Sequence, residues 1–139
     1  MIPVHIQKLS DDNLRRELQS LAGRERDIEA SIIEHVAEVL RRQVYLKWQF
    51  ANVTRYLIEE LRFSESSAYR RIQAARMHLE IPEVADEVRK GELNVSQINQ
   101  LQRALNQDHK QTGQKVTTEK KRLILEQIKE KTQVETDKI

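Results

Sequence analysis

Apolar side chains recur along this chain at the spacing of one helical face, and polar side chains fill the positions between them. The pattern is longest between residues 24 and 46, where it predicts a helix longer than the usual length of about 11–12 residues. Glycine and proline are rare throughout, which also favours helices. We therefore predict an all-α fold: a multi-helix orthogonal bundle that contains a helix-turn-helix and has a long N-terminal scaffold helix.

A shorter helix is predicted before the long one. Ser10 has the side chain of a helix N-cap, and Leu14, Leu18 and Leu21 recur on one face after it. Gly23 is expected to end this helix, because glycine readily adopts the left-handed conformation of a helix C-terminus.

Further helix starts follow residue 79. Pro82 suits a first helical position, Asn94 with Gln97 forms a capping box, and Thr118 begins the last helix. The segment 107–118 is polar and has no apolar period, which indicates a linker.

These signals predict the domain organisation. Residues 1–106 form a helical DNA-binding domain with the helix-turn-helix at 52–79, followed by a polar linker at 107–118 and a C-terminal helix at 119–139. A second capping signal, T-x-x-E, begins at Thr132, very near the end of the sequence. We therefore expect the chain to continue in its natural context, with the last helix leading into a nuclease module.

The two helices between residues 52 and 79 carry the candidate functional residues. Asn52 and Ser64 are placed to cap them, and the short turn between keeps the helices in contact, as in a helix-turn-helix. The predicted apolar stripe of the second helix consists of Ala68, Ile72, Ala75 and Leu79. Away from it lie hydroxyl, amide and guanidinium groups, which suit DNA phosphates and base edges. The candidate DNA-binding residues are Ser64, Ser66, Ser67, Tyr69, Arg70, Arg71, Gln73 and Arg76.

The charge distribution is consistent with this assignment. The chain has a net charge of +2, but residues 1–40 carry −3, residues 41–80 carry +4 and residues 81–139 carry +1. Positive charge is therefore concentrated on the helix-turn-helix, as expected for a nucleic-acid footprint. The excess is modest, and an ordinary surface helix with a solvated basic face would also explain it.

Three aromatic side chains, Tyr45, Trp48 and Phe50, lie between the long helix and the helix-turn-helix. Two interpretations are open: a hydrophobic plug at the point where the chain turns, and a platform on which bases stack. We favour the plug, because base-stacking platforms usually come with strands and none is predicted here.

Composition excludes several classes of function. The chain has no cysteine, so it has neither disulfides nor thiolate metal sites. No apolar run approaches the roughly 20 residues of a membrane span, and no signal peptide begins the chain, so we expect a cytoplasmic protein without membrane contact. No catalytic grouping of side chains stands out, and no cofactor or metal is expected.

Three segments carry a resemblance to a known family: LSDDNLRRELQSLAGRERDIEASIIEHVAEVLRR, SESSAYRRIQAAR and IPEVADEVRKGELNVSQINQLQRAL. In this order they resemble the helical domain that precedes the HNH module in a group of bacterial HNH endonucleases, over most of Leu9 to Ile139. Residues 54–105 also show a weaker resemblance to the helix-turn-helix region of ParB-like plasmid partition proteins. The second resemblance implies DNA binding through residues 64–76, and the first implies the targeting half of a nuclease.

The nuclease chemistry itself is missing from this sequence. An HNH module needs paired histidines and an asparagine around one divalent cation. The four histidines here are scattered, at His5, His35, His78 and His109. We therefore predict that this chain is not an enzyme, and the sequence leaves open whether a longer parent protein is an HNH endonuclease.

Two hypotheses follow. The first is a helical module that binds double-stranded DNA, as the non-catalytic N-terminal part of an HNH-endonuclease-like protein. The second is a protein-interaction or dimerisation module without direct DNA contact, in which the long helix pairs with a second copy, as a homodimer, or with a downstream nuclease domain. The acidic N-terminal third, which is unsuited to phosphate, supports the second.

Overall fold

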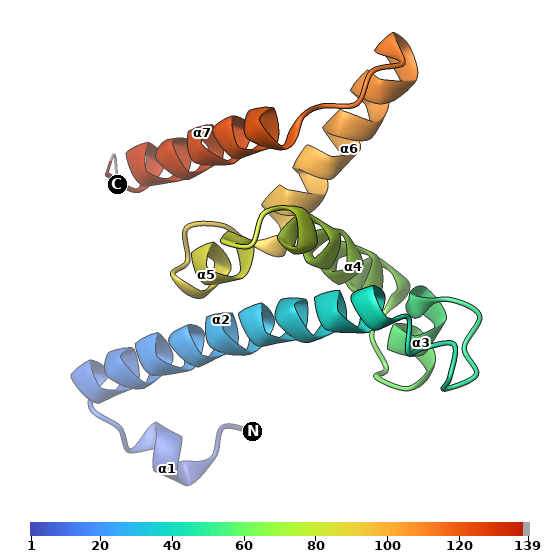
Figure 1. Cartoon of the computed structure of the whole chain (residues 1–139). Helices are drawn as coiled ribbons and strands as arrows, with labels where there is room; N and C mark the ends of the chain where they lie inside the picture. Colours follow the sequence, from blue (N-terminus) through green and yellow to red (C-terminus); the bar gives the residue numbers. More distant parts are fainter. Residues whose placement is uncertain (138–139) are drawn as a thin grey trace.

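The computed structural model describes the backbone of residues 1–137 and the side chains of residues 1–131. Within that range the backbone forms seven helices and no strand, which confirms the all-α prediction (Figure 1). The helices are α1 (Val4–Gln7), α2 (Asp11–Arg42), α3 (Val53–Glu59), α4 (Glu65–Glu80), α5 (Val84–Arg89), α6 (Val95–Thr112) and α7 (Thr118–Asp137).

Helix α2 is the predicted long N-terminal helix, and it begins earlier than expected. Ser10 caps it, because the Ser10 side chain accepts a hydrogen bond from the amide of Asn13 at 3.1 Å. The prediction that Gly23 ends a first helix is wrong. A glycine inside a helix lowers helix stability by only about 1 kcal/mol relative to alanine. Ending the helix at Gly23 would cost more, because backbone amides and carbonyls on both sides of the break would lose their hydrogen bonds. The helix ends instead at Arg42, and its C-cap residue Gln43 adopts the left-handed conformation with φ 54°.

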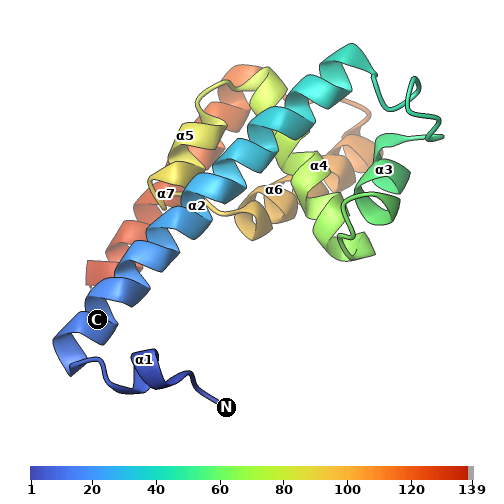
Figure 2. The same ribbon diagram turned by 90° about the horizontal axis from the view of Figure 1, so that it is seen from below.

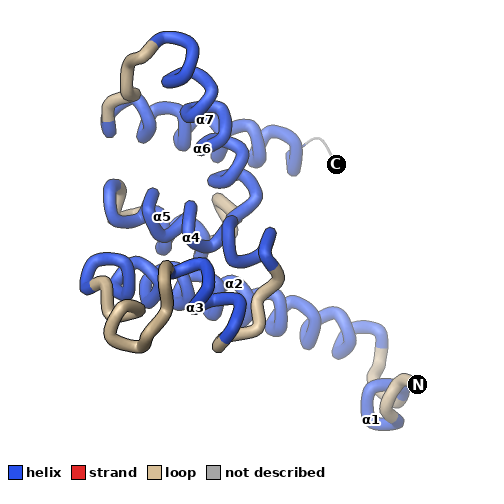
Figure 3. The backbone as a smooth tube through the Cα atoms, turned by 90° about the vertical axis from the view of Figure 1, so that its right-hand side faces the viewer, coloured by secondary structure: helices blue, strands red, loops and turns tan. Residues whose placement is uncertain are grey.

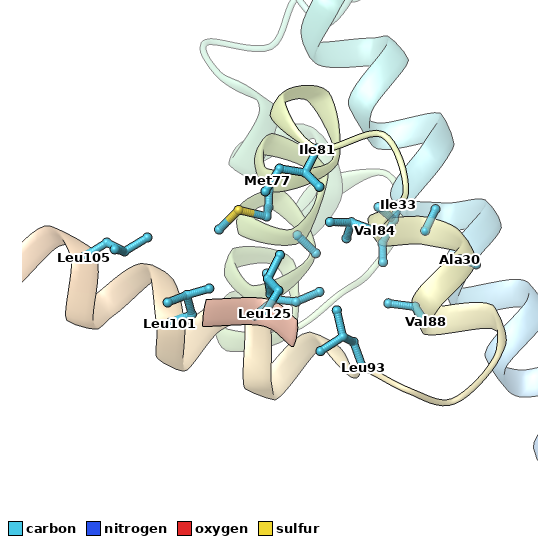
Figure 4. Close-up of a cluster of buried hydrophobic side chains, with 13 residues drawn as sticks. Ala30, Ile33, Met77, Ile81, Val84, Val88, Leu93, Leu101, Leu105 and Leu125 are labelled. Atoms are coloured by element: carbon cyan, nitrogen blue, oxygen red, sulfur yellow. The ribbon is translucent and has the colours of Figure 1, made fainter. Parts of the chain in front are cut away.

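Helix α4 lies at the centre of the bundle and contributes to two hydrophobic clusters. Its Ala74 and Met77 belong to a cluster that also draws side chains from α2, α5, α6 and α7 (Figure 4). Its Ala68 and Ile72 belong to a second cluster, with side chains of α2 and α3. Because α4 is packed on several sides at once, only a narrow arc of its surface remains exposed.

The predicted linker is shorter than residues 107–118. Helix α6 continues to Thr112 and ends at Gly113, whose φ of 72° suits glycine, and α7 begins at Thr118. Leu125 of α7 is only 2% exposed, within the first cluster, so α7 packs against the bundle. The predicted second capping signal at Thr132 lies outside the described side chains. The backbone of α7 is continuous there, so no new helix begins.

Ion pairs hold α7 against α4 and α5. The pairs are Lys121–Glu80 at 2.7 Å, Arg122–Glu83 at 2.6 Å and Lys129–Glu87 at 2.7 Å. Partial burial alone would disfavour the charged ammonium of Lys129, but hydrogen bonds to Glu126 and Glu87 outweigh it and raise the pKa of Lys129. Two of the three basic residues at the start of α7, Lys121 and Arg122, are therefore paired with carboxylates of the bundle.

The aromatic segment between α2 and α3 packs on Tyr56 of α3. The ring centroids of Trp48 and Phe50 lie 5.0 and 5.3 Å from that of Tyr56. The predicted hydrophobic plug is therefore present only in part, because Trp48 remains 45% exposed.

Candidate nucleic-acid interface

Helices α3 and α4 are joined by the five residues 60–64 and lie against each other at one end of α2 (Figure 2). Asn52 caps α3 by accepting a hydrogen bond from the amide of Arg55 at 2.9 Å. Ser64 caps α4 in the same way, accepting from the amide of Ser67 at 3.2 Å. Each cap pairs an amide that the helix itself leaves without a partner, so the sequence fixes both helix starts locally.

A solvent-open groove of about 740 Å³ lies beside the first half of α4. Its walls come from three helices, α3, α4 and α6, so it exists only in the folded chain. The lining residues are Thr54, Glu65, Ser66, Tyr69, Arg70, Asn99 and Arg103. They combine two guanidinium groups with hydroxyl and amide groups and a single carboxylate.

Two polar atoms of this lining are buried without a hydrogen-bond partner among the described residues. They are Nε of Arg70 and Oδ1 of Asn99, and Asn99 as a whole is only 8% exposed. A buried polar group left unpaired costs about 1–3 kcal/mol, so such atoms mark a place where a ligand or water can complete the bonding. Among the described side chains, neither Arg70 nor Arg103 forms an ion pair. The positive charge of the groove is therefore available to a ligand.

The structure divides the predicted site residues into groups. Ser66, Tyr69 and Arg70 line the groove together, and Tyr69 is 38% exposed. Ser64 and Ser67 instead serve local structure, Ser64 as the cap and Ser67 as a partner of Arg71.

Arg71 belongs to the fold rather than to the groove. Its guanidinium forms an ion pair with Glu29 of α2 at 3.1 Å, and both side chains are less than one-fifth exposed. It also lies 5.0 Å from the ring centroid of Phe63 and donates a hydrogen bond to the carbonyl oxygen of Ser67 at 3.1 Å. These contacts leave Arg71 little freedom to reach an external phosphate.

The predicted faces of α4 need two corrections. Gln73 was predicted on the exposed arc, but it is 7% exposed, so that placement is wrong. Leu79 was predicted to face inward, but it is 47% exposed, while the neighbouring Met77 is buried. Both errors arise because four other helices pack on α4, and one apolar stripe does not describe its buried surface. Arg76 is exposed and lies outside the groove lining.

Three groove residues outside α4 were not predicted from the sequence: Thr54, Asn99 and Arg103. Asn99 and Arg103 are four residues apart, so they share one face of α6. That spacing was visible in the sequence. Nothing in the sequence pattern indicated, however, that this face of α6 would lie beside Arg70.

The described side chains and helices show neither a metal site nor a membrane span. No three His, Asp or Glu side chains among them are grouped so as to hold a metal ion. Likewise, none of the helices within residues 1–137 combines the length and the apolar character needed to cross a membrane.

The fold and the groove together define an all-α bundle with a cation-lined groove between its helices. The model of one protein family matches residues 15–139, and the chain therefore belongs to that family, described as Domain of unknown function (DUF222). Neither the curated proteins nor the solved structures provide a match. The family description names no activity, so the resemblances to HNH endonucleases and ParB-like proteins stay expectations.

Proposed function

We propose that this chain is a DNA-binding helical module that contacts duplex DNA through α4 and the groove beside it. In this proposal it is the non-catalytic targeting part of an HNH-endonuclease-like protein, and the α3–α4 pair acts as the helix-turn-helix. The observation that carries the proposal is that two guanidinium groups, Arg70 of α4 and Arg103 of α6, line one open groove, and neither forms an ion pair with a carboxylate of residues 1–131.

The chemistry of the groove suits a sugar-phosphate backbone. Guanidinium groups bind phosphate oxygens in a bidentate manner, and the hydroxyl groups of Ser66 and Tyr69 add hydrogen bonds to phosphate. Glu65 is the single carboxylate of the lining. Binding should therefore depend mainly on charge and differ little between duplexes of unrelated sequence.

A salt titration tests the proposal. Three cations without an ion pair among the described side chains, Arg70, Arg76 and Arg103, predict a slope of about −2.7 for log affinity against log salt, roughly a 40-fold loss from 50 to 200 mM. Replacing Arg70 and Arg103 together by alanine should reduce the slope by about 1.8. Binding is measured by fluorescence anisotropy on two unrelated duplexes.

The matched control removes two positive charges elsewhere. Arg16 at the start of α2 and Lys90 after α5 are both exposed and lie outside the groove. The Arg16→Ala, Lys90→Ala variant should bind with the parental affinity and slope. Equal losses in the two double variants would reject the groove as the interface, and a strong preference for one duplex would reject backbone-dominated binding.

The second candidate function is a protein-interaction module without direct DNA contact. One observation favours it: Leu14, Leu18 and Leu21 on α2 are 40%, 60% and 52% exposed. If neither duplex binds even at low salt, the protein-interaction function is the better one.

A further inference from the structure

The first turns of α2 extend past α3, α4, α5 and α6, as two perpendicular views show (Figures 1 and 3). Four large apolar side chains along α2 are 40–61% exposed: Leu14, Leu18, Leu21 and Ile28. A contiguous apolar stripe on an exposed helix usually marks an interaction surface. We call these residues, with Glu25 between them, the α2 seam.

The spacing of the α2 seam is that of a coiled coil. Its positions 14, 18, 21, 25 and 28 are separated alternately by four and three residues, and the next step of four reaches Ile32. Ile32 packs against the second hydrophobic cluster, so the seam runs into the bundle. There it meets an apolar groove of about 510 Å³ lined in part by Ile28, Leu61 and Phe63.

We propose that the α2 seam binds a second copy of this chain, with the two α2 helices antiparallel. An antiparallel pair in heptad register sets Leu18 of one copy against Leu21 of the other. The same register sets Glu25 against Leu14, near the end of the contact, where its carboxylate can reach water. A parallel pair would instead oppose the two copies of Glu25 in the middle of the apolar seam, which is unfavourable for two carboxylates.

Charge complementarity specifies the same arrangement. Glu17 and Arg24 flank the seam on one side and are one heptad apart. In an antiparallel pair these flanking positions face each other, so Glu17 of each copy meets Arg24 of the other, twice by symmetry. Within residues 1–131 neither side chain has an ion-pair partner, and the guanidinium of Arg24 makes only a 3.4 Å contact with the hydroxyl of Ser20. In a parallel pair Glu17 would face Ala22 instead.

This dimer does not depend on DNA binding. The seam and the cation-lined groove share no residue. Helix α3 and the start of α4, which contribute to the groove, lie far from the start of α2 (Figure 2). The dimer would therefore carry two separate grooves. Failure of either proposal leaves the other intact, because one is measured by self-association without DNA and the other by affinity for duplex.

Sedimentation equilibrium of the whole 139-residue chain over micromolar to millimolar concentrations tests the seam. The parent should form dimers, and Leu18→Gln with Leu21→Gln should leave only monomers. Both leucines are more than half exposed in one copy, so circular dichroism should show unchanged helix content. A parent that stays monomeric throughout overturns the proposal.

Charge reversals test the register. Glu17→Arg or Arg24→Glu alone opposes like charges at both symmetric contacts and should raise the dissociation constant about tenfold. The two reversals together restore the pairs and should return it to near the parental value. Arg16→Glu, at an outward position of the same helix, is the matched control and should have little effect. A double reversal as weak as the single ones overturns the register.

Engineered cysteines test the orientation, since the chain has no cysteine of its own. A mixture of Leu14→Cys and Glu25→Cys chains should form a disulfide between the two. Leu14→Cys alone should not, because the two copies of position 14 would lie about 16 Å apart along the axis, and a disulfide needs Cα atoms within about 7 Å. Efficient crosslinking of Leu14→Cys to itself would show a parallel pair and overturn the antiparallel arrangement.

Discussion

Replacing Arg71 by methionine should lower the free energy of unfolding much more than the same replacement at Arg76, an exposed arginine of the same helix. The Arg71 guanidinium pairs with Glu29 at 3.1 Å and lies over the ring of Phe63. Oε1 of Glu29 already has no hydrogen-bond partner. Without Arg71 the carboxylate of Glu29 would therefore stay partly buried with no compensating charge.

The structure sets the expected magnitude. Breaking a fully buried ion pair costs about 3–5 kcal/mol, but side chains that are 17% and 18% exposed retain some solvent, which reduces the cost to about 1–2 kcal/mol. The lost contact with Phe63 adds about 0.5–1 kcal/mol. The sum of about 2 kcal/mol corresponds to a shift of roughly 1 M in the urea midpoint.

Urea unfolding followed by circular dichroism measures this shift. Arg76→Met is the matched control, because Arg76 lies on the same helix and is exposed, and it should leave the midpoint almost unchanged. In a double-mutant cycle, Glu29→Gln should reduce the effect of Arg71→Met to the roughly 0.5–1 kcal/mol of the Phe63 contact, since residues in direct contact are not additive. If Arg71→Met unfolds at the parental midpoint, or if the two substitutions are additive, the pair does not hold α4 to α2.

Two further predictions concern the core and the response to acid. Ile72→Ala should cost about 2–5 kcal/mol in urea unfolding, because Ile72 is 2% exposed at the contact of α4 with α2 and α3; an unchanged midpoint would show that the side chain is not in the core. Hydrogen bonds from Arg41 and Arg42 lower the pKa of Glu38 to about 2 from 4.5, so its contribution to stability is present above pH 4.5 and is lost as the pH falls towards 2. An NMR titration of the Glu38 carboxyl should show that midpoint in the parent, and an unshifted midpoint would contradict the hydrogen bonds.

Features that depend on neighbouring residues alone could be predicted from the sequence. The caps at Ser10, Asn52 and Ser64 are all confirmed by side-chain hydrogen bonds to the predicted helix starts. The capping box of Asn94 and Gln97 is also confirmed, with both reciprocal bonds present. A cap is decided within four residues, so no knowledge of the tertiary fold is needed.

Features that depend on distant helices could not be predicted in this way. The helical periodicity of α4 predicts that the polar residue Gln73 faces solvent. The packing of other helices on α4 buries it instead. The apolar stripe that contains Leu14 and Leu18 predicts a buried helix face, yet no described element covers these two side chains. The end of α6, where the linker begins, was predicted too early in the sequence for a related reason. A polar sequence at residues 107–112 remained helical because α6 continues there from a start that is capped and packed.

The two consecutive arginines of α4 show why a count of basic residues does not define an interface. Successive side chains on a helix point about 100° apart, so Arg70 turns to the groove while Arg71 turns to α2 and pairs with Glu29. The prediction from the sequence includes both arginines as phosphate contacts and gives no role to Arg103. The fold brings Arg103, from α6, into the same groove as Arg70. The number of cations available for the proposed DNA contact is therefore still three, but one of them comes from another helix. It follows that Arg103→Ala should weaken duplex binding with little loss of stability, whereas Arg71→Met should lower stability and leave the salt slope of the folded protein near its parental value.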